Sequence, residues 1–287
     1  MPELPEVEVV KQSLEKYILN KKLLKIIVKN KRLRYPVPDN ISKKLANLKI
    51  NIVKRISKYL VIGFKNELFL IIHLGMSGTL HLIRTRNNSQ NTNLSFYHSK
   101  NLPKKHNHVL FNFNNFSIIF NDPRRFGFIK LIIGNINLKN YFSKLGPDPF
   151  DKDFNFKYIK EYFFKKNKNI KNTIIDQKFI SGIGNIYASE ILNYSKINPF
   201  KNSGKISNNE IEKIIFYTKK VLKLSIKRGG TTINNFLSIN GRQGSYQKEF
   251  RVYDKENKSC KNKLCLGTII KVNISNRSTY MCNICQK

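Results

Sequence analysis

All four cysteines of the chain lie in its last 28 residues, at a spacing that could hold a metal ion. Four residues separate Cys260 from Cys265, two separate Cys282 from Cys285, and sixteen lie between the pairs. Disulfide cysteines would not cluster in this way, and four thiolates so spaced can close a tetrahedron around zinc. The sequence therefore predicts one structural Zn2+ held by these cysteines, with four free thiols as the alternative. Because a site with four protein ligands has no open position, it would support folding and not catalysis.

The segment between the two cysteine pairs is typical of a β-hairpin. Thr268–Val272 and Arg277–Met281 are predicted as its strands. Arg277 would then be held near the tip of the hairpin, where a guanidinium can reach a phosphate. Without further context, Arg277 is an ordinary solvated surface residue.

The N-terminus offers a second reactive group. Because Met1 precedes the small residue Pro2, we expect the initiator to be removed and the secondary amine of Pro2 to be freed. An α-amino group has a pKa of roughly 8, far below the roughly 10.4 of lysine, so part of it is an unprotonated nucleophile near neutral pH. Glu3 lies beside it, at the positive end of a predicted helix. On these residues alone, a proline that starts a helix and a helix-terminal carboxylate are the ordinary explanation. The helix is predicted from apolar residues at helical spacing, Val7, Val10, Leu14 and Tyr17.

The elements that would position these groups change in kind along the chain. The first half has short apolar runs split by turn residues such as Lys65-Asn66, which predicts a β-sandwich or barrel. The runs are Leu23–Val28, Tyr59–Phe64, Leu68–Leu74, Val109–Phe113, Ser117–Phe120 and Phe126–Ile133. Between Arg84 and His108, a polar and Asn-rich stretch predicts a long loop.

The second half is predicted to be helical. One helix is indicated by a capping box of Ser207 and Glu210 and by its termination at Gly229-Gly230. Its apolar face is Ile211, Ile214, Ile215, Val221 and Leu222.

The fold class is therefore α+β. The turn Gly146-Pro147-Asp148-Pro149 marks the change of pattern. We predict a β domain with a leading helix over residues 2–135, a linker over 136–153, a helical domain over 154–250 and the metal module over 251–287.

Composition narrows the classes of function. The formal net charge of +35 favours a polyanionic partner, usually nucleic acid. The chain is also rich in Lys, Asn and Ile, whose codons are AT-rich, so genome composition could supply part of this excess. No window approaches the roughly 18 apolar residues of a membrane span, and the acidic N-terminus is unlike a signal peptide. We expect a soluble cytoplasmic protein with no membrane contact, and a monomer because no motif demands a partner chain.

Six segments resemble, in order, the motifs of formamidopyrimidine-DNA glycosylase, the bacterial 8-oxoguanine repair enzyme, and the cysteine module is the seventh. The segments are Met1-Pro2-Glu3-Leu4-Pro5-Glu6-Val7-Glu8, Lys58-Tyr59-Leu60, His73-Leu74-Gly75-Met76-Ser77-Gly78, Asp122-Pro123-Arg124-Arg125-Phe126-Gly127, Gly182-Ile183-Gly184-Asn185-Ile186-Tyr187-Ala188-Ser189-Glu190 and Gly229-Gly230-Thr231-Thr232. The resemblance spans the whole chain. It implies an N-terminal β-sandwich, a helix-two-turn-helix domain and a zinc finger, acting on damaged double-stranded DNA. Leu4 and Ile186–Glu190 match the purine branch of the family better than the endonuclease VIII branch, which prefers oxidised pyrimidines.

The resemblance also implies roles for individual residues. Pro2 would be the nucleophile that forms a Schiff base with the sugar, and Glu3 the acid that helps to open the sugar ring. Lys58 would be the general acid of the first elimination at the abasic site, and Arg277 that of the second; both are also natural phosphate ligands. Glu6 would be a supporting residue.

Such chemistry requires the damaged base to be flipped out of the duplex. Met76, Arg124 and Phe126 match the family residues that fill the gap, with Arg124 bonding to the orphaned cytosine. Met76 and Phe126 lie in a loop-like context with glycines nearby, which favours exposure over core packing. Asn185 is expected near a phosphate at a helix start. His106 either matches a DNA-contacting histidine or is an exposed loop residue.

The sequence departs from the family pattern at four places. The first cysteine pair has four intervening residues where the family normally has two, and the Arg84–Lys105 loop is longer than usual. Asn167 stands where the family uses a lysine on DNA, with Lys166 and Lys168 beside it. Thr231–Tyr246 only partly matches the loop that covers the flipped base. A pyrimidine-preferring enzyme and a non-catalytic zinc-finger DNA-binding protein therefore remain alternatives.

Overall fold

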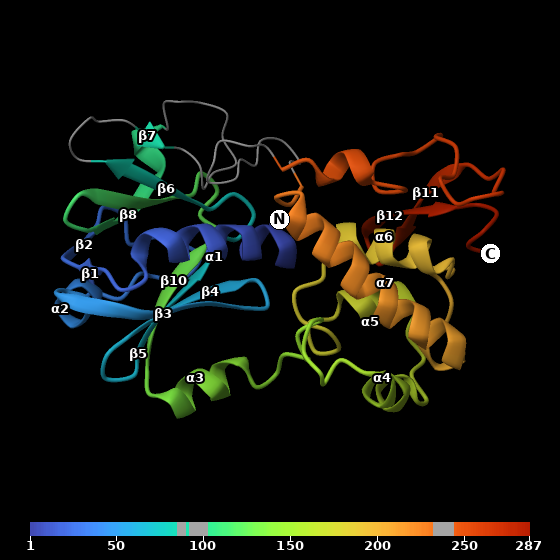
Figure 1. Ribbon diagram of the computed structural model, residues 1–287, viewed down its shortest axis with the longest axis horizontal. Coiled ribbons are helices and arrows are strands. Elements are labelled where there is room, and N and C mark those ends of the chain that lie inside the picture. The colour runs from blue at the N-terminus through green and yellow to red at the C-terminus, as the bar shows by residue number, and fades with distance from the viewer. Residues whose placement is uncertain (85–89, 92–102, 232–243) are drawn as a thin grey trace. The chain divides into compact units, whose positions relative to one another are not determined.

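The computed structural model of the protein describes residues 1–84, 90–91, 103–231 and 244–287 (Figure 1). The chain divides into two compact units. Unit 1 comprises Met1–Ser143 and Ile226–Gln247, and unit 2 comprises Lys144–Ser225 and Lys248–Lys287. This division differs from the predicted domains, because residues 226–247 group with the β unit and the cysteine module groups with the helices.

Unit 1 begins with helix α1 (Leu4–Ile18), which confirms the predicted leading helix. Two five-stranded sheets follow, and all their strand pairs are antiparallel. The first sheet has the order β1 (Lys22–Leu23), β3 (Leu48–Ile56), β4 (Tyr59–Phe64), β5 (Leu68–His73) and β10 (Phe128–Ile133). The second has the order β2 (Lys25–Val28), β8 (Asn107–Asn112), β9 (Phe116–Asn121), β6 (Thr79–Arg84) and β7 (Gln90–Asn91).

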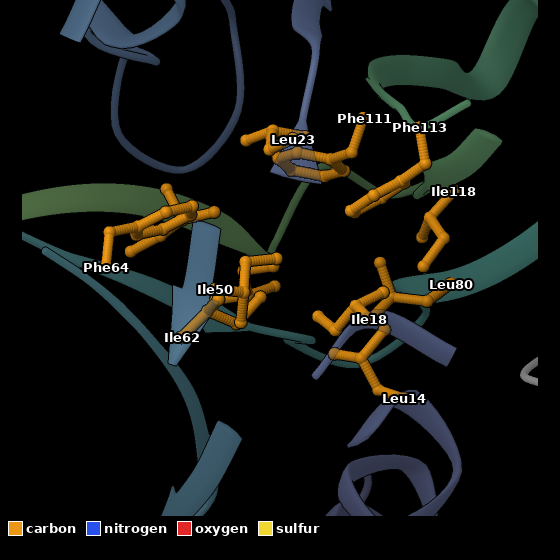
Figure 2. Close-up of a pocket in the computed structure, with 12 residues that line it drawn as sticks. Leu14, Ile18, Leu23, Ile50, Ile62, Phe64, Leu80, Phe111, Phe113 and Ile118 are labelled. Carbon is orange, nitrogen blue, oxygen red and sulfur yellow. The ribbon is translucent and has the colours of Figure 1, made fainter. Parts of the chain in front are cut away.

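Both sheets and α1 bury side chains in one apolar core, so unit 1 is a β-sandwich. Leu14 of α1 shares this core with Ile62 and Leu70 of the first sheet and with Leu80 and Phe111 of the second. A small apolar cavity of about 10 Å3 lies among these side chains (Figure 2). A cavity of this size holds at most about one water molecule. It is therefore a packing gap and not a ligand site.

The predicted strand Leu23–Val28 is in fact two strands. Lys22 of β1 pairs with Lys49 in the first sheet, whereas Lys25 of β2 pairs with Asn112 in the second. The chain thus passes from one sheet to the other at Leu24, a change that the continuous apolar run does not reveal.

Three further strands of the sandwich, β3, β6 and β7, escape prediction. β3 has a register shift between Ile50 and Ile52, and such a bulge breaks the alternation by which strands are found. β7 lies inside the predicted Arg84–Lys105 loop and pairs with β6. Residues 85–89 and 92–102 of that predicted loop lie outside the described part of the chain.

The first part of the predicted linker over 136–153 contains a helix. Helix α3 (Asn135–Phe142) occupies it, and Leu138 packs against Val61, Phe69 and Ile71 of the first sheet. The remaining short elements of unit 1 are α2 (Ile41–Leu45) and the single turns η1 (Lys104–His106) and η3 (Tyr246–Glu249), the last of which extends past the unit boundary.

Unit 2 is helical, with a β-hairpin near its end. Its elements are α4 (Phe156–Phe163), α5 (Ile170–Ile175), α6 (Asn185–Ser195), η2 (Ser203–Lys205), α7 (Asn208–Lys227, of which 208–225 belong here), β11 (Ile269–Ile274) and β12 (Arg277–Cys282). The predicted capping box of α7 is confirmed: the Glu210 amide donates to Ser207 Oγ (3.3 Å), and the Ser207 amide donates to Glu210 Oε2 (2.8 Å). Within the described residues, no helix is long and apolar enough to cross a membrane.

Candidate functional site

Pro2 and Glu3 lie buried at the start of α1, where Glu3 is the N-cap residue. The Glu3 amide donates to Glu6 Oε2 at 2.9 Å. The other oxygen of Glu6 accepts the amide and the hydroxyl of Thr231, at 2.9 and 3.0 Å. Glu6, only 2% exposed, therefore joins the start of the helix to a segment 225 residues further along. The sequence indicated Glu6 only as a supporting residue.

Lys58 occupies the two-residue turn between β3 and β4 and is 7% exposed. Ser57, the other turn residue, has a φ of 54°, which a tight hairpin requires. Arg55 donates to the Ser57 carbonyl at 3.0 Å and to Glu8 of α1 at 2.8 Å. The position of the Lys58 backbone is thus tied to α1.

His73 ends β5 and fixes the loop that follows. Burial, and then the charges of Lys58 and Arg34, lower the pKa of His73 to about 4. The ring is therefore neutral at pH 7, and its Nδ1 accepts the Gly75 amide at 3.0 Å. It stacks on Phe128 with 5.2 Å between ring centroids.

A buried carboxylate joins the two loops that carry the predicted gap-filling residues. Asp122, 0% exposed, accepts the Ser77 hydroxyl at 2.5 Å on one oxygen and the Gly127 amide at 2.7 Å on the other. Ser77 Oγ in turn accepts the Arg124 amide at 3.2 Å. The backbones meet so closely that a Cβ on Gly75 would lie 2.4 Å from the Gly127 nitrogen. The sequence alone does not indicate this role for Asp122, although the carboxylate opens the motif Asp122–Gly127.

The side chains carried by these loops point outward. Met76 and Phe126 are each 43% exposed, which confirms the expected exposure. The Arg124 guanidinium lies 4.7 Å from the centroid of the Phe126 ring, a cation–π distance. His106, half-buried in η1, is adjacent, because its carbonyl accepts the Asp122 amide at 3.0 Å. Unit 1 thus gathers four of the predicted DNA-contacting residues.

Unit 2 brings Asn185 and the hairpin tip together. Asn185 is the first residue of α6, and its Nδ2 donates to the Ser278 carbonyl at 2.9 Å. Arg277, the neighbour of Ser278, is exposed directly after the two-residue turn Ser275-Asn276. Both turn residues have positive φ, as a tight hairpin of this type requires.

Two buried charged residues of unit 2 have no counterpart in the sequence predictions. Lys171 of α5 is 0% exposed and donates to Thr279 Oγ1 of β12 at 2.5 Å. Glu190 of α6, also 0% exposed, accepts the amides of residues 251–253 at 2.9 to 3.0 Å. Burial raises the pKa of Glu190, and the amide donors act in the opposite direction. These bonds attach the hairpin and the start of the metal module to the helices.

The four cysteines converge as predicted. Their sulfur atoms all lie within 4.8 Å of one another, with Cys260 and Cys285 3.7 Å apart and Cys265 and Cys282 3.6 Å apart. Four sulfurs at about 2.3 Å from a tetrahedral zinc ion would be about 3.8 Å apart, so the geometry fits. Burial raises the pKa of Cys260 and of Cys285, whereas a bond from the Gly267 amide lowers the pKa of Cys265 to about 7.

Known proteins resemble this chain along its whole length. Residues 1–129 match the family model of the formamidopyrimidine-DNA glycosylase N-terminal domain, and residues 145–237 match that of the formamidopyrimidine-DNA glycosylase H2TH domain. The formamidopyrimidine-DNA glycosylase of Rickettsia bellii is 38% identical over 288 residues, covering 100% of both chains. That of Wolbachia sp. subsp. Brugia malayi is 38% identical over 287 residues, again covering 100% of both.

Solved structures of proteins with the same family name also match the whole chain. A Lactococcus lactis FPG mutant in complex with a Fapy-dG containing DNA has a TM-score of 0.87 and 30% identity over 100% of both chains. MutM in complex with carbocyclic 8-oxo-G containing DNA has a TM-score of 0.86 and 31% identity over 100% of both.

Proposed function

Because the chain belongs to the formamidopyrimidine-DNA glycosylase family of DNA-repair enzymes, we propose that it removes oxidised purines from double-stranded DNA and then cleaves the strand at the abasic site. The substrates are 8-oxoguanine and formamidopyrimidines, in keeping with the DNA in the two solved complexes. The net charge of +35 suits a polyanionic partner. The protein acts as a monomer in the cytoplasm, where bacterial DNA lies.

The observation that carries the proposal is the start of α1, where Pro2 precedes an N-cap carboxylate in a buried setting. After removal of Met1, the Pro2 amine attacks C1′ of the damaged nucleotide. The bond from C1′ to the base breaks and the base leaves, and the iminium forms when the bond from C1′ to the ring oxygen then breaks. Glu3 supplies the proton that opens the sugar ring.

The iminium acidifies the sugar protons and so drives strand cleavage. Loss of one proton expels the 3′ phosphate, and loss of a second expels the 5′ phosphate. Lys58 protonates the first leaving group and Arg277 the second. The hairpin turn around Ser57 and the turn at Ser275-Asn276 support these two assignments, because both hold the cation on a short, constrained loop.

Met76, Arg124 and Phe126 fill the gap that the flipped base leaves, and Arg124 bonds to the orphaned cytosine. Asn185 and His106 contact the backbone of the DNA. The four cysteines hold one Zn2+, which supplies the cross-link that a module this small needs to fold. The cysteines themselves position the hairpin that carries Arg277.

A borohydride trap tests the proposal. The protein, with a free N-terminus, is mixed with a duplex that holds 8-oxoguanine opposite cytosine, borohydride is added, and the adduct is mapped by mass spectrometry. We expect a covalent adduct on Pro2. Pro2→Gly should lose most strand nicking while duplex binding persists.

A thymine-glycol duplex is the matched control for substrate class. Faster trapping on thymine glycol than on 8-oxoguanine would overturn the purine assignment. Unchanged nicking by Pro2→Gly, or by a protein with a blocked N-terminus, would overturn the proposed nucleophile.

A further inference from the structure

The cysteine sulfurs share a pattern of amide donors. The amides of Asn262, Gly267 and Ile284 donate to Cys260, Cys265 and Cys282, at 3.4, 3.4 and 3.5 Å. Each donor lies two residues after its cysteine. The residue two after Cys285 is Lys287, the last in the chain. At this fourth sulfur the donor is a side chain instead, because Asn262 Nδ2 lies 3.0 Å from Cys285 Sγ.

This bond matters for the charge of the site. Four thiolates around a divalent cation carry two excess negative charges, and N–H donors disperse such charge most effectively when it is shielded from water. Asn262 is only 6% exposed, and it serves two sulfurs, one through its backbone amide and one through its side chain.

Asn262 also holds the module to α6. Its Nδ2 lies 3.4 Å from the Asn193 carbonyl in the last turn of the helix, and this carbonyl also accepts the Lys196 amide at 3.1 Å. Gln286 is a second buried side-chain amide that holds the module to α6, and within the described residues it has no contact with a sulfur. Gln286 accepts from Asn193 Nδ2 at 2.8 Å and donates to the Ile197 carbonyl at 2.9 Å.

We propose that Asn262 is a positioning residue of the metal site, which disperses the charge of the Cys285 thiolate and fixes the module against α6. The four-residue spacer after Cys260 makes this possible, because it is long enough to turn Asn262 inward while Leu264, at a φ of 60°, stays exposed. The inference deepens the metal site of the proposed function. Its test uses no DNA, so its outcome is independent of whether the glycosylase assignment holds.

The test compares two variants of similar size that lack the donor. Asn262→Leu removes it, and Asn262→Asp replaces it with a negative charge that faces the thiolate. The full-length protein is titrated with Zn2+ against a chromophoric chelator, and the Co2+ form is examined for its thiolate-to-metal charge-transfer band. We expect Asn262→Leu to lose about 10- to 100-fold in Zn2+ affinity and Asn262→Asp to lose more. The band should move to longer wavelength, since a thiolate without its donor holds its electrons less tightly.

Gln286→Leu is the comparison variant, because it removes the bonds to α6 and the bond from the Cys282 amide to Gln286 Oε1 (2.9 Å) but removes no bond to sulfur. It should lower the melting temperature and leave the charge-transfer band in place. Asn273→Ala, an exposed change on β11, should alter neither quantity. An Asn262→Leu affinity within about twofold of the parent protein, or an equal band shift in Gln286→Leu, would overturn the proposal. If Asn262→Leu does not fold, the Zn2+ affinity and the charge-transfer band are measured on the isosteric Asn262→Asp instead.

Discussion

Arg55 donates a 2.8 Å hydrogen bond to Glu8, and this ion pair links α1 to the turn that carries Lys58. The Arg55 side chain is 8% exposed and that of Glu8 17%, so both charges are largely shielded from water. The two proposed catalytic groups, at the start of α1 and in the β3–β4 turn, are therefore coupled through one guanidinium.

Replacing Arg55 by Met should reduce strand cleavage more than DNA binding. The change removes the shortest bond to the Glu8 carboxylate and the bond to the Ser57 carbonyl, which we expect to cost about 2 kcal/mol in the free energy of unfolding. Urea unfolding and the rate of borohydride trapping measure the two effects. Lys49→Met, an exposed change on the same strand, is the control. Equal behaviour of the two variants would contradict the coupling.

Asp122→Asn should loosen the two loops that meet around it. An amide cannot accept all the bonds that the carboxylate accepts from Ser77, Gly127 and the Arg124 amide, and the site is fully buried. Because Arg124 is proposed to bond to the opposite cytosine, discrimination between cytosine and adenine opposite the lesion should fall by about 5- to 100-fold, equivalent to about 1–3 kcal/mol. Single-turnover excision on the two duplexes measures this ratio. Asp153→Asn, at an exposed site, should leave the ratio unchanged.

Glu6→Gln should destabilise unit 1 and slow formation of the covalent adduct. One carboxylate oxygen accepts from Glu3 and the other from Thr231, so a carboxamide must direct its own donor at one of them. A loss of about 2 kcal/mol in the free energy of unfolding is expected. Glu15→Gln, in the same helix but more exposed, should change stability by less than about 0.5 kcal/mol. If the two variants prove equally stable, Glu6 is not the link described above.

Stability should fall as pH decreases from 6.5 toward 4. Burial lowers the pKa of His81 to about 3, and burial with nearby positive charge lowers that of His73 to about 4, both from 6.5. Below pH 6.5 the unfolded chain therefore takes up protons that the folded chain does not, so stability is complete above that pH and is lost below it. Each histidine contributes up to about 1.4 kcal/mol per pH unit in this range. Urea unfolding at several pH values should give a shallower slope for His73→Gln and His81→Gln than for the parent protein. A slope that neither variant alters would exclude both histidines as its source.

The features found from sequence are those encoded over a few adjacent residues. The capping box at Ser207, the hairpin that ends at Cys282 and the convergence of the cysteines all depend on short spacings. The features not found depend on residues far apart. Asp122 joins Ser77 across 45 positions, and Glu190 accepts amides 61 to 63 positions away. The local signal for Asp122 and for Glu190 is only that each is a carboxylate within a family motif.

Strand prediction failed for related reasons. β3 is not predicted because the bulge at Ile50 breaks the alternation of its side chains. The change of sheet at Leu24 is not predicted because the apolar run continues through it. Apart from the four cysteines, the candidate site residues follow from family resemblance, because neither a terminal proline nor a single lysine carries a pattern of its own.

The bond from Thr231 to Glu6 has a consequence for how the protein is made. A ribosome that adds about 5–20 residues per second needs roughly 10–45 s to travel from one partner to the other. During that interval Glu6, among the first residues to emerge, has no Thr231 to accept from. The nascent β-sandwich therefore lacks this bond until Thr231 has been synthesised, so the start of α1 gains its contact with the Thr231 segment only late in synthesis.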